Sequence, residues 1–232
     1  MRGIGVVPIS RQGGTLEAAA TGGWWDNFGA IAGCWGAWQA KGATSFAASL
    51  ADQTGNGRHL VDPGGAATPA WAVGVGWTFD GIANYLVTTF VCDADQTQSG
   101  IAQFAAWNGL AFDFLFGQWD GGGATRRFGV APDWGGGNAH YMNQNEQNGA
   151  AAVAAAGNLA VAGAQGYYNG IADGIPLAAG ASAMLWPVYV GCWNNNGAPA
   201  GFFGGNIVAL ALYERTLTAP EVATVAAAMA AL

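Results

Sequence analysis

Paired carboxylates are the residues of this sequence that could most directly do chemistry, because glycoside hydrolysis uses two of them, about 5 Å apart in retaining enzymes. The closest pair, Asp93 and Asp95, lies at the expected end of a strand, in a polar context typical of solvated loop acids. We therefore predict no catalytic residues and no enzymatic activity. A glycoside hydrolase or lyase that uses Asp113 or Asp120 is the less favoured alternative.

The histidines and the glycine runs offer weaker chemistry. His59 and His140 are the only histidines, and no G-x-S-x-G motif accompanies either of them. The glycine runs at 121–123 and 135–137 lack the G-x-x-x-x-G-K-[ST] context of a phosphate-binding loop. We interpret the histidines as surface or hydrogen-bonded residues and the glycines as parts of loops.

Aromatic side chains are the better candidates for a binding role. Several lie in or beside segments rich in Gly, Asn and Asp, where an indole can stack on a sugar ring while amides bond its hydroxyls. The predicted ligand-binding residues are Trp119, Trp134, Tyr141, Trp193 and Asn194. The alternative is that these rings cap the domain or contact a neighbouring subunit, since aromatic residues are enriched at interfaces.

Short strands must position these side chains. From Cys34 onward, short apolar segments alternate with turn residues, which is typical of an antiparallel β-sandwich. Residues 77–80 alternate large apolar and polar side chains, which predicts a strand with one buried face. Phe112, Phe114 and Phe116 follow the same period of two, so we expect them to share one face of a strand.

Two local signals predict a hairpin and a helix in the C-terminal third of the chain. Asn169-Gly170 predicts a hairpin, because both central residues of a type I′ turn need positive φ. Thr218 and Glu221 form a capping box around Pro220, which predicts the start of a helix. The residues that this helix should bury are Val222, Val225 and Met229.

The composition is unusually poor in charge. Charged residues make up 9% of the 232 residues, against roughly 25% in typical soluble domains. Sheet edges are normally protected by lysine, and the chain has only Lys41. This suggests a surface covered by neighbouring subunits, although a host whose proteins are generally rich in alanine and glycine would give the same composition. The net charge of −7 disfavours binding to nucleic acid.

The N-terminal region differs from the rest. Residues 1–33 contain few regularly spaced large apolar residues, so we expect an extended arm that docks through aromatic side chains, with one domain over 34–232. The predicted anchoring residues are Trp24, Trp25 and Phe28. The first residues do not match a signal peptide, and the longest apolar stretch, 150–164, is too short to span a bilayer. We expect synthesis in the cytoplasm, no membrane segment and reduced cysteines.

Five segments, in the expected order, resemble the concanavalin A-like, laminin G-like group. They include the D-x-T-G-N-G turn, the F-D-G strand pair and the Y-N-G hairpin, and they lie at 51–60, 76–88, 166–177, 187–196 and 206–222. The resemblance covers roughly residues 35 to 230. It implies an all-β fold, a two-sheet antiparallel jelly-roll sandwich, with an extended N-terminal arm and a short C-terminal helix.

The resemblance also bears on metal binding and catalysis. Some laminin G-like domains bind calcium at the rim of the sandwich, and three residues near glycine-rich loops could supply oxygen ligands, with ordinary turns as the alternative. These candidates are Asp120, Asp133 and Asn138. No other cofactor is expected. The E-x-D-x-x-E motif of the glycosidases in this superfamily is missing from the sequence.

Proteins of this composition within the group are often encoded by phages, where they sit on virions. We therefore predict a non-enzymatic structural or accessory protein on the surface of a phage particle, decorating the head or tail. Its expected partners are capsid or tail proteins, further copies of itself and cell-surface glycans, with neither nucleic acid nor membrane among them. A glycan-binding, lectin-like adhesion module is the alternative.

Overall fold

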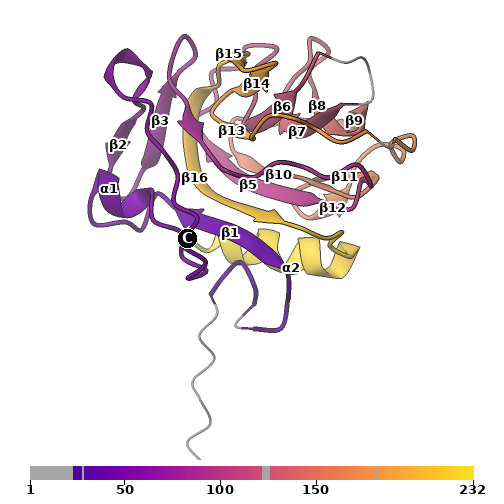
Figure 1. Cartoon of the computed structure of the whole chain (residues 1–232), viewed down its shortest axis with the longest axis horizontal. Coiled ribbons are helices and arrows are strands. Elements are labelled where there is room, and N and C mark those ends of the chain that lie inside the picture. The colour runs from indigo at the N-terminus through magenta and orange to yellow at the C-terminus, as the bar shows by residue number, and fades with distance from the viewer. Residues whose placement is uncertain (1–22, 28, 122–125, 181) are drawn as a thin grey trace, which may run out of the picture.

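The computed structural model describes residues 23–27, 29–121, 126–180 and 182–232, and it shows two β-sheets packed face to face (Figure 1). Sheet A has eight strands in the order β12-β11-β10-β5-β16-β3-β2, and β1 also pairs with β16. Its strands are β1 (Cys34–Gln39), β2 (Ala70–Ala72), β3 (Gly76–Asp80), β5 (Ser99–Ala105), β10 (Gly157–Ala162), β11 (Gln165–Tyr168), β12 (Ile171–Ala172) and β16 (Gly204–Tyr213).

Sheet B also has eight strands, in the order β15-β14-β6-β7-β8-β9, and β13 joins β4 to β6. Its strands are β4 (Leu86–Val87), β6 (Phe116–Trp119), β7 (Arg127–Ala131), β8 (Asn138–Asn143), β9 (Asn145–Ala152), β13 (Tyr189–Val190), β14 (Trp193–Asn195) and β15 (Ala198–Ala200). The described helices are α1 (Phe46–Ser49), α2 (Ala219–Ala230) and the 3-10 turn η1 (Gly65–Ala67). The all-β sandwich with a short C-terminal helix is therefore confirmed.

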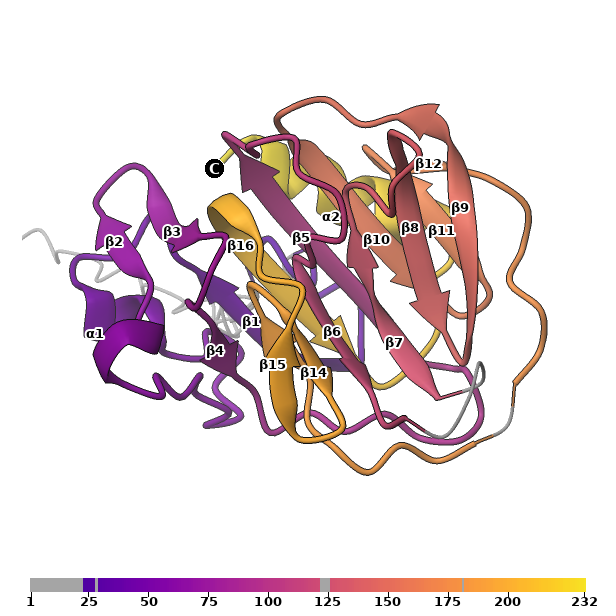
Figure 2. The same cartoon turned by 90° about the horizontal axis from the view of Figure 1, so that it is seen from above.

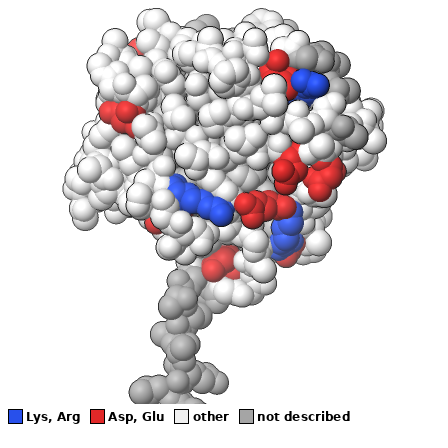
Figure 3. All heavy atoms as spheres, viewed as in Figure 1, with Lys and Arg blue, Asp and Glu red and all other residues white. Residues whose placement is uncertain are grey.

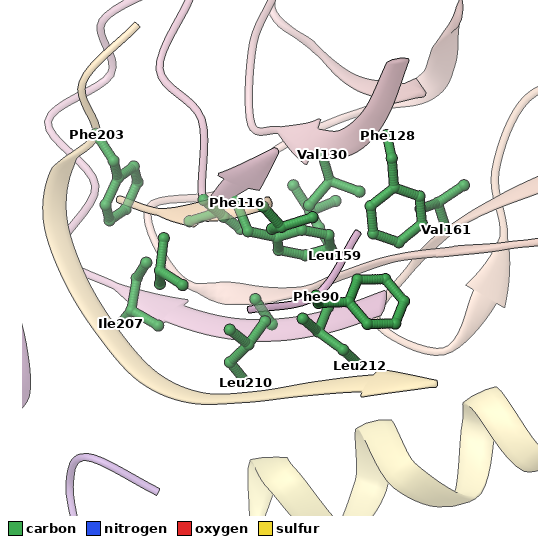
Figure 4. Packing of buried hydrophobic residues seen from close by; sticks show 14 of the residues in the cluster. Phe90, Phe116, Phe128, Val130, Leu159, Val161, Phe203, Ile207, Leu210 and Leu212 are labelled. Atoms are coloured by element: carbon green, nitrogen blue, oxygen red, sulfur yellow. The ribbon is translucent and has the colours of Figure 1, made fainter. Parts of the chain in front are cut away.

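The main core lies between the two sheets. Alternate residues of each strand point into it, as the pleat requires, and large side chains interdigitate there (Figure 4). Those labelled in Figure 4 are Phe90, Phe116, Phe128, Val130, Leu159, Val161, Phe203, Ile207, Leu210 and Leu212. Each fully buried side chain of this size contributes roughly 1.5 to 3 kcal/mol to folding, so this layer fixes the relative position of the sheets.

Helix α2 covers the outer face of sheet A (Figure 1). The Thr218–Glu221 capping box forms as predicted, and the helix buries Val222, Val225 and Met229. Arg215 makes two hydrogen bonds with the Glu221 carboxylate and holds its pKa down, at about 2. The outer face of sheet A is thus part of the hydrophobic core.

The described part of the N-terminal region belongs to the hydrophobic cluster that α2 forms with the outer face of sheet A. Trp24 and Trp25 are buried beside α2, and the hydroxyl of Tyr213 donates to the carbonyl oxygen of Trp25. Their rings therefore stabilise the domain itself and do not form an exposed anchor, which corrects the expected role of these two residues. Phe28 and residues 1–22 lie outside the described residues, so the predicted arm is assessed only from residue 23 onward.

Two local predictions had different outcomes. Asn169 and Gly170 have φ of 51° and 77° and connect β11 to β12, which confirms the hairpin. The prediction that Phe112, Phe114 and Phe116 share a face is wrong. Phe112 has φ of 66° in an exposed turn, and β6 begins only at Phe116. Phe114 packs outside sheet B, and Phe116 packs in the main core.

All three cysteines are free, and burial raises the pKa of each thiol, which keeps the thiols protonated and unreactive. None of the described helices has the length and apolar character needed to cross a bilayer.

Candidate functional site

The outer face of sheet B differs from that of sheet A in having no described helix packed on it (Figures 1 and 2). On β7, Phe128 and Val130 point into the main core, so Arg127, Gly129 and Ala131 lie on the outer side. On β8 the outer side carries His140 and Met142 by the same alternation. No described helix covers this face, but Ala131, His140 and Met142 are themselves buried, and aromatic side chains pack on them.

A stack of aromatic rings stands on this face. Trp193 lies parallel to Phe114, with ring centroids 4.7 Å apart and planes 3° apart. Trp119 stacks on Trp193 at 5.1 Å and 18°, and the guanidinium of Arg127 lies 5.3 Å from the Trp119 ring centroid. Contacts with Phe114 and Trp119 thus occupy Trp193 on two sides, so we interpret this indole as support for the site.

Two glycines allow the rings to approach the sheet. A Cβ at Gly117 would lie 3.3 Å from the Cβ of Trp193 and 3.5 Å from Phe114. Gly129, the residue opposite Gly117 on β7, has φ of 151°, and a Cβ there would clash with the carbonyl oxygen of Phe116. Gly117 therefore leaves room for the aromatic stack, whereas Gly129 lets β7 approach the backbone of β6; together the two form a glycine strip across these strands.

Trp134 extends the aromatic group toward β9. Its ring meets that of Trp193 edge to face, with centroids 5.9 Å apart, and it stacks on the imidazole of His140 at 4.7 Å and 13°. The loop that carries it is fixed by Asp133, whose Oδ1 accepts hydrogen bonds from the amides of residues 135–137 at 2.7 to 2.8 Å. These hydrogen bonds join the residues before and after Trp134, and they therefore fix the loop that carries its indole.

An open pocket of about 390 Å³ lies beside Trp134. Its volume falls within the roughly 300 to 1,000 Å³ of typical small-molecule sites. The lining combines one indole with groups that can donate or accept hydrogen bonds, and it consists of Trp134, His140, Glu146, Gln147 and Asn148. One aromatic wall with several polar groups around it can contact both an apolar surface and polar groups of a small molecule.

The polar groups of the pocket are linked to each other. Arg127 forms an ion pair with the carboxylate of Glu146, and Nε2 of His140 lies 3.4 Å from the same carboxylate. Nδ1 of His140 lies 2.7 Å from the Oδ1 of Asn148. Burial lowers the pKa of His140, the Asn148 contact partly opposes this, and the charge of Arg127 adds to it. The imidazole is therefore neutral at neutral pH.

Three of the predicted binding residues come together on this face: Trp119, Trp134 and Trp193. The other two do not join them. Tyr141 is fully buried in the main core, where its hydroxyl donates to Asp173 at 2.8 Å, and Asn194 is buried as well. The side-chain amide of Asn194 donates to the carbonyl oxygen of Pro187, and its oxygen accepts from the backbone amide of Gly197. Both residues are structural, which corrects their predicted role.

The predicted calcium ligands have other partners. Arg126 lies 3.3 Å from the Asp120 carboxylate, Asp133 binds loop amides, and Asn138 donates to the carbonyl of Gly149. Within the described ranges no three His, Cys, Asp or Glu side chains form a group that could hold a metal ion. In the described structure these three residues therefore stabilise turns and strands through their own partners.

Sequence reasoning missed most of the pocket lining. The sequence motifs indicate only a weak catalytic possibility for His140, and they assign no binding role to Glu146, Gln147 or Asn148. The signal was the run N-Q-N-E-Q-N at 143–148, in which amides and a carboxylate follow one another. The register of β8 and β9, which places His140 opposite Asn148, turns this run into part of a site.

No protein-family model and no curated protein matches this chain. Solved structures do. Domain 4 of AbnA, a GH43 extracellular arabinanase from Geobacillus stearothermophilus, solved in complex with arabinotriose, aligns at a TM-score of 0.57 and 18% identity over 84% of this chain and 98% of that domain. The Trypanosoma rangeli sialidase aligns at 0.56 and 16% over 83% of this chain.

The chain spans 32% of the length of the sialidase, so it corresponds to a part of that enzyme. At these identities the likeness shows the fold. Both neighbours share with this chain a β-sandwich of the jelly-roll kind, in agreement with the fold that the sequence motifs imply.

Proposed function

We propose that this protein is a non-catalytic glycan-binding module, and that the pocket beside Trp134 is its binding site. The observation that carries the proposal is the combination of an indole with a carboxylate, an imidazole and two amides around one open pocket. A sugar ring presents apolar C–H groups on its faces and hydroxyls at its rim. The first would contact Trp134, and the second would bond the polar side chains.

The charges in the pocket support binding without catalysis. Glycoside hydrolysis normally needs two carboxyl groups on opposite sides of the scissile bond. The pocket lining contains one, Glu146, and Arg127 already pairs with it. Asp113, considered above for a hydrolase, is buried and accepts a hydrogen bond from the amide of Gly204. Glu146 therefore serves as a hydrogen-bond acceptor in this proposal.

The fold supports the same assignment. Almost the whole length of domain 4 of the arabinanase aligns with this chain, and that domain was solved in complex with arabinotriose. A sandwich of this kind can thus present a sugar-binding surface. The identity of the sugar for the present chain comes from its own side chains, because fold alone does not determine function.

A glycan array probed with the labelled protein tests the proposal. We expect binding to one class of oligosaccharide, abolished by Trp134→Ala and weakened by Glu146→Gln, with both variants still folded at the temperature of the assay. Val73→Ala is the matched control, because this side chain is exposed at a distant turn between β2 and β3. Binding that survives Trp134→Ala would place the site elsewhere, and no binding on the array would contradict the proposal.

The low charge favours a second assignment, compatible with the first: attachment to a virus particle with the glycan site facing the host cell. Figure 3 shows one face of the molecule, on which uncharged residues dominate and each group of basic side chains has an acidic side chain beside it. Such a surface suits contact with neighbouring subunits. Quantitative mass spectrometry of purified particles should find the protein at a fixed ratio to the major shell protein, and its absence from particles would contradict this assignment.

A further inference from the structure

A second pair of aromatic rings lies on the outer face of sheet B. Tyr85 and Tyr189 stack with centroids 5.1 Å apart and planes 28° apart. Leu86 and Val190, which follow them in the chain, point into the main core, so the two tyrosines lie on the opposite, outer side. Both rings are partly exposed. They are therefore accessible in the same direction as the pocket.

The tyrosine pair adjoins the tryptophan stack. Tyr189 is opposite Gly117 in the pairing of β13 with β6, and Trp193 is opposite the same glycine in the pairing of β14 with β6. The strand register thus places Tyr189 and Trp193 beside the same glycine of β6. The aromatic side chains from the Tyr85–Tyr189 pair through Trp193 to Trp134 are together called the aromatic strip.

The ionised side chains in and beside the pocket have partners within the protein. Arg127 pairs with Glu146, and the buried carboxylate of Asp133 accepts hydrogen bonds from three loop amides. The strip therefore carries little net charge, while the whole chain carries −7 and would repel an anionic polymer. These charges favour an uncharged ligand over one rich in carboxylate or sulfate groups.

We infer that the ligand is an extended, uncharged polysaccharide chain that contacts the protein at two places, the pocket beside Trp134 and the Tyr85–Tyr189 pair. This inference rests on the proposed glycan binding and specifies its ligand class. A chain that reaches both places gains the second contact without losing further translational freedom, so affinity should rise with length. A single sugar or disaccharide in the pocket would not reach the tyrosines.

The test measures affinity against length in neutral arabino-, xylo-, cello- and manno-oligosaccharides from about two to about six sugar units, a range over which a second contact comes within reach. For the series that binds, we expect at least about a tenfold gain from the shortest to the longest member. Tyr85→Ala with Tyr189→Ala should reduce this long-to-short ratio to about one, because the second contact is lost. The double Phe variant should keep the ratio, since the rings remain.

Trp71→Ala serves as the control, because this partly buried indole lies on the β2 edge of sheet A. It should leave the ratio unchanged. A length-independent affinity, a gain that persists without the tyrosines, or tighter binding of a charged oligosaccharide such as sialyllactose or oligogalacturonate would overturn the inference while leaving glycan binding intact. Failure of every oligosaccharide, charged or neutral, would overturn the proposed function and the inference together.

Discussion

The indole of Trp193 lies flat against the ring of Phe114, with centroids 4.7 Å apart and planes 3° apart, and Trp119 stacks close by at 5.1 Å. Trp193 is therefore in stacking contact with rings of the protein itself on two sides. Trp134 meets it edge to face and also lines the open pocket. The tryptophans of this face thus divide into a supporting stack and one indole placed to contact a ligand.

This division predicts different effects for two substitutions. Trp193→Ala removes a partly buried ring with two stacking partners, so we expect a loss of about 2 kcal/mol in the free energy of unfolding. Trp134 also has ring contacts, among them the stacked His140 and the edge of Phe112, but it lines the open pocket, so we expect Trp134→Ala to cost less stability and to remove glycan binding. Chemical denaturation of both variants, followed by binding assays on the folded proteins, measures the difference. A larger stability loss for Trp134→Ala would contradict the division.

The second prediction concerns the stability of the protein when a side chain is added to the glycine strip. Gly129→Ala should lower the free energy of unfolding by about 3 kcal/mol, because it combines an unfavourable φ with a clash against the carbonyl oxygen of Phe116. Gly136→Ala is the matched control, since nothing lies within 4 Å of a Cβ there. Its effect on thermal unfolding should be negligible. Equal melting temperatures for the two variants would show that the strip tolerates side chains.

The loop that carries Trp134 depends on Asp133. Asp133→Ala removes the acceptor of three amide hydrogen bonds, and we expect weaker glycan binding together with a stability loss of about 2 kcal/mol. Asp133→Asn keeps an acceptor oxygen in the same place and should retain most of both. Binding and denaturation measurements on the pair decide the question, and an unaffected Ala variant would show that the loop is held by other contacts.

Asp113 makes stability depend on pH. Burial raises the pKa of this carboxyl to about 6, with the Gly204 hydrogen bond opposing and Asp133 adding to the rise. The folded chain therefore binds the Asp113 proton more tightly than the unfolded chain, whose aspartate has a pKa of about 3.9. This residue's contribution to the free energy of unfolding falls by about 2 kcal/mol as pH rises from about 4 to about 6 and stays constant above.

Asp113→Asn should remove this dependence, so the variant gains stability relative to the parent protein as pH rises. Thermal unfolding of both proteins from acid to neutral pH measures the difference curve. Asp95→Asn provides a control of opposite sign, because hydrogen bonds led by that from the Thr97 hydroxyl lower the pKa of the exposed Asp95. A flat difference curve for Asp113→Asn would show that its carboxyl is not held in the protonated form.

Local sequence signals predicted much of the fold. The hairpin at Asn169-Gly170 and the helix start at Thr218 depend on φ preference and on side chains within four residues, and both are present. The predicted shared face of the three phenylalanines failed because Phe112 turns the chain before the strand begins, which is a conformation that periodicity does not encode.

The candidate site was predicted only in part. Trp119, Trp134 and Trp193 were identified from their loop contexts, but their stacking depends on strand pairings between distant parts of the chain. The same holds for Tyr141, whose local sequence mixes polar and apolar residues and does not show that its side chain points into the core. Strand direction and register decide which side of a sheet a ring occupies, and a one-residue change reverses it.

The most direct test of glycan binding at the outer face of sheet B is a titration of the ¹⁵N-labelled protein with uncharged oligosaccharides, arabinotriose among them, observing the tryptophan indole signals. We predict that the Trp134 signal, identified by its loss in Trp134→Phe, shifts with ligand while those of the buried Trp38 and Trp77 do not. Shifts confined to other indoles, or no shift with any member of the panel, would contradict the account.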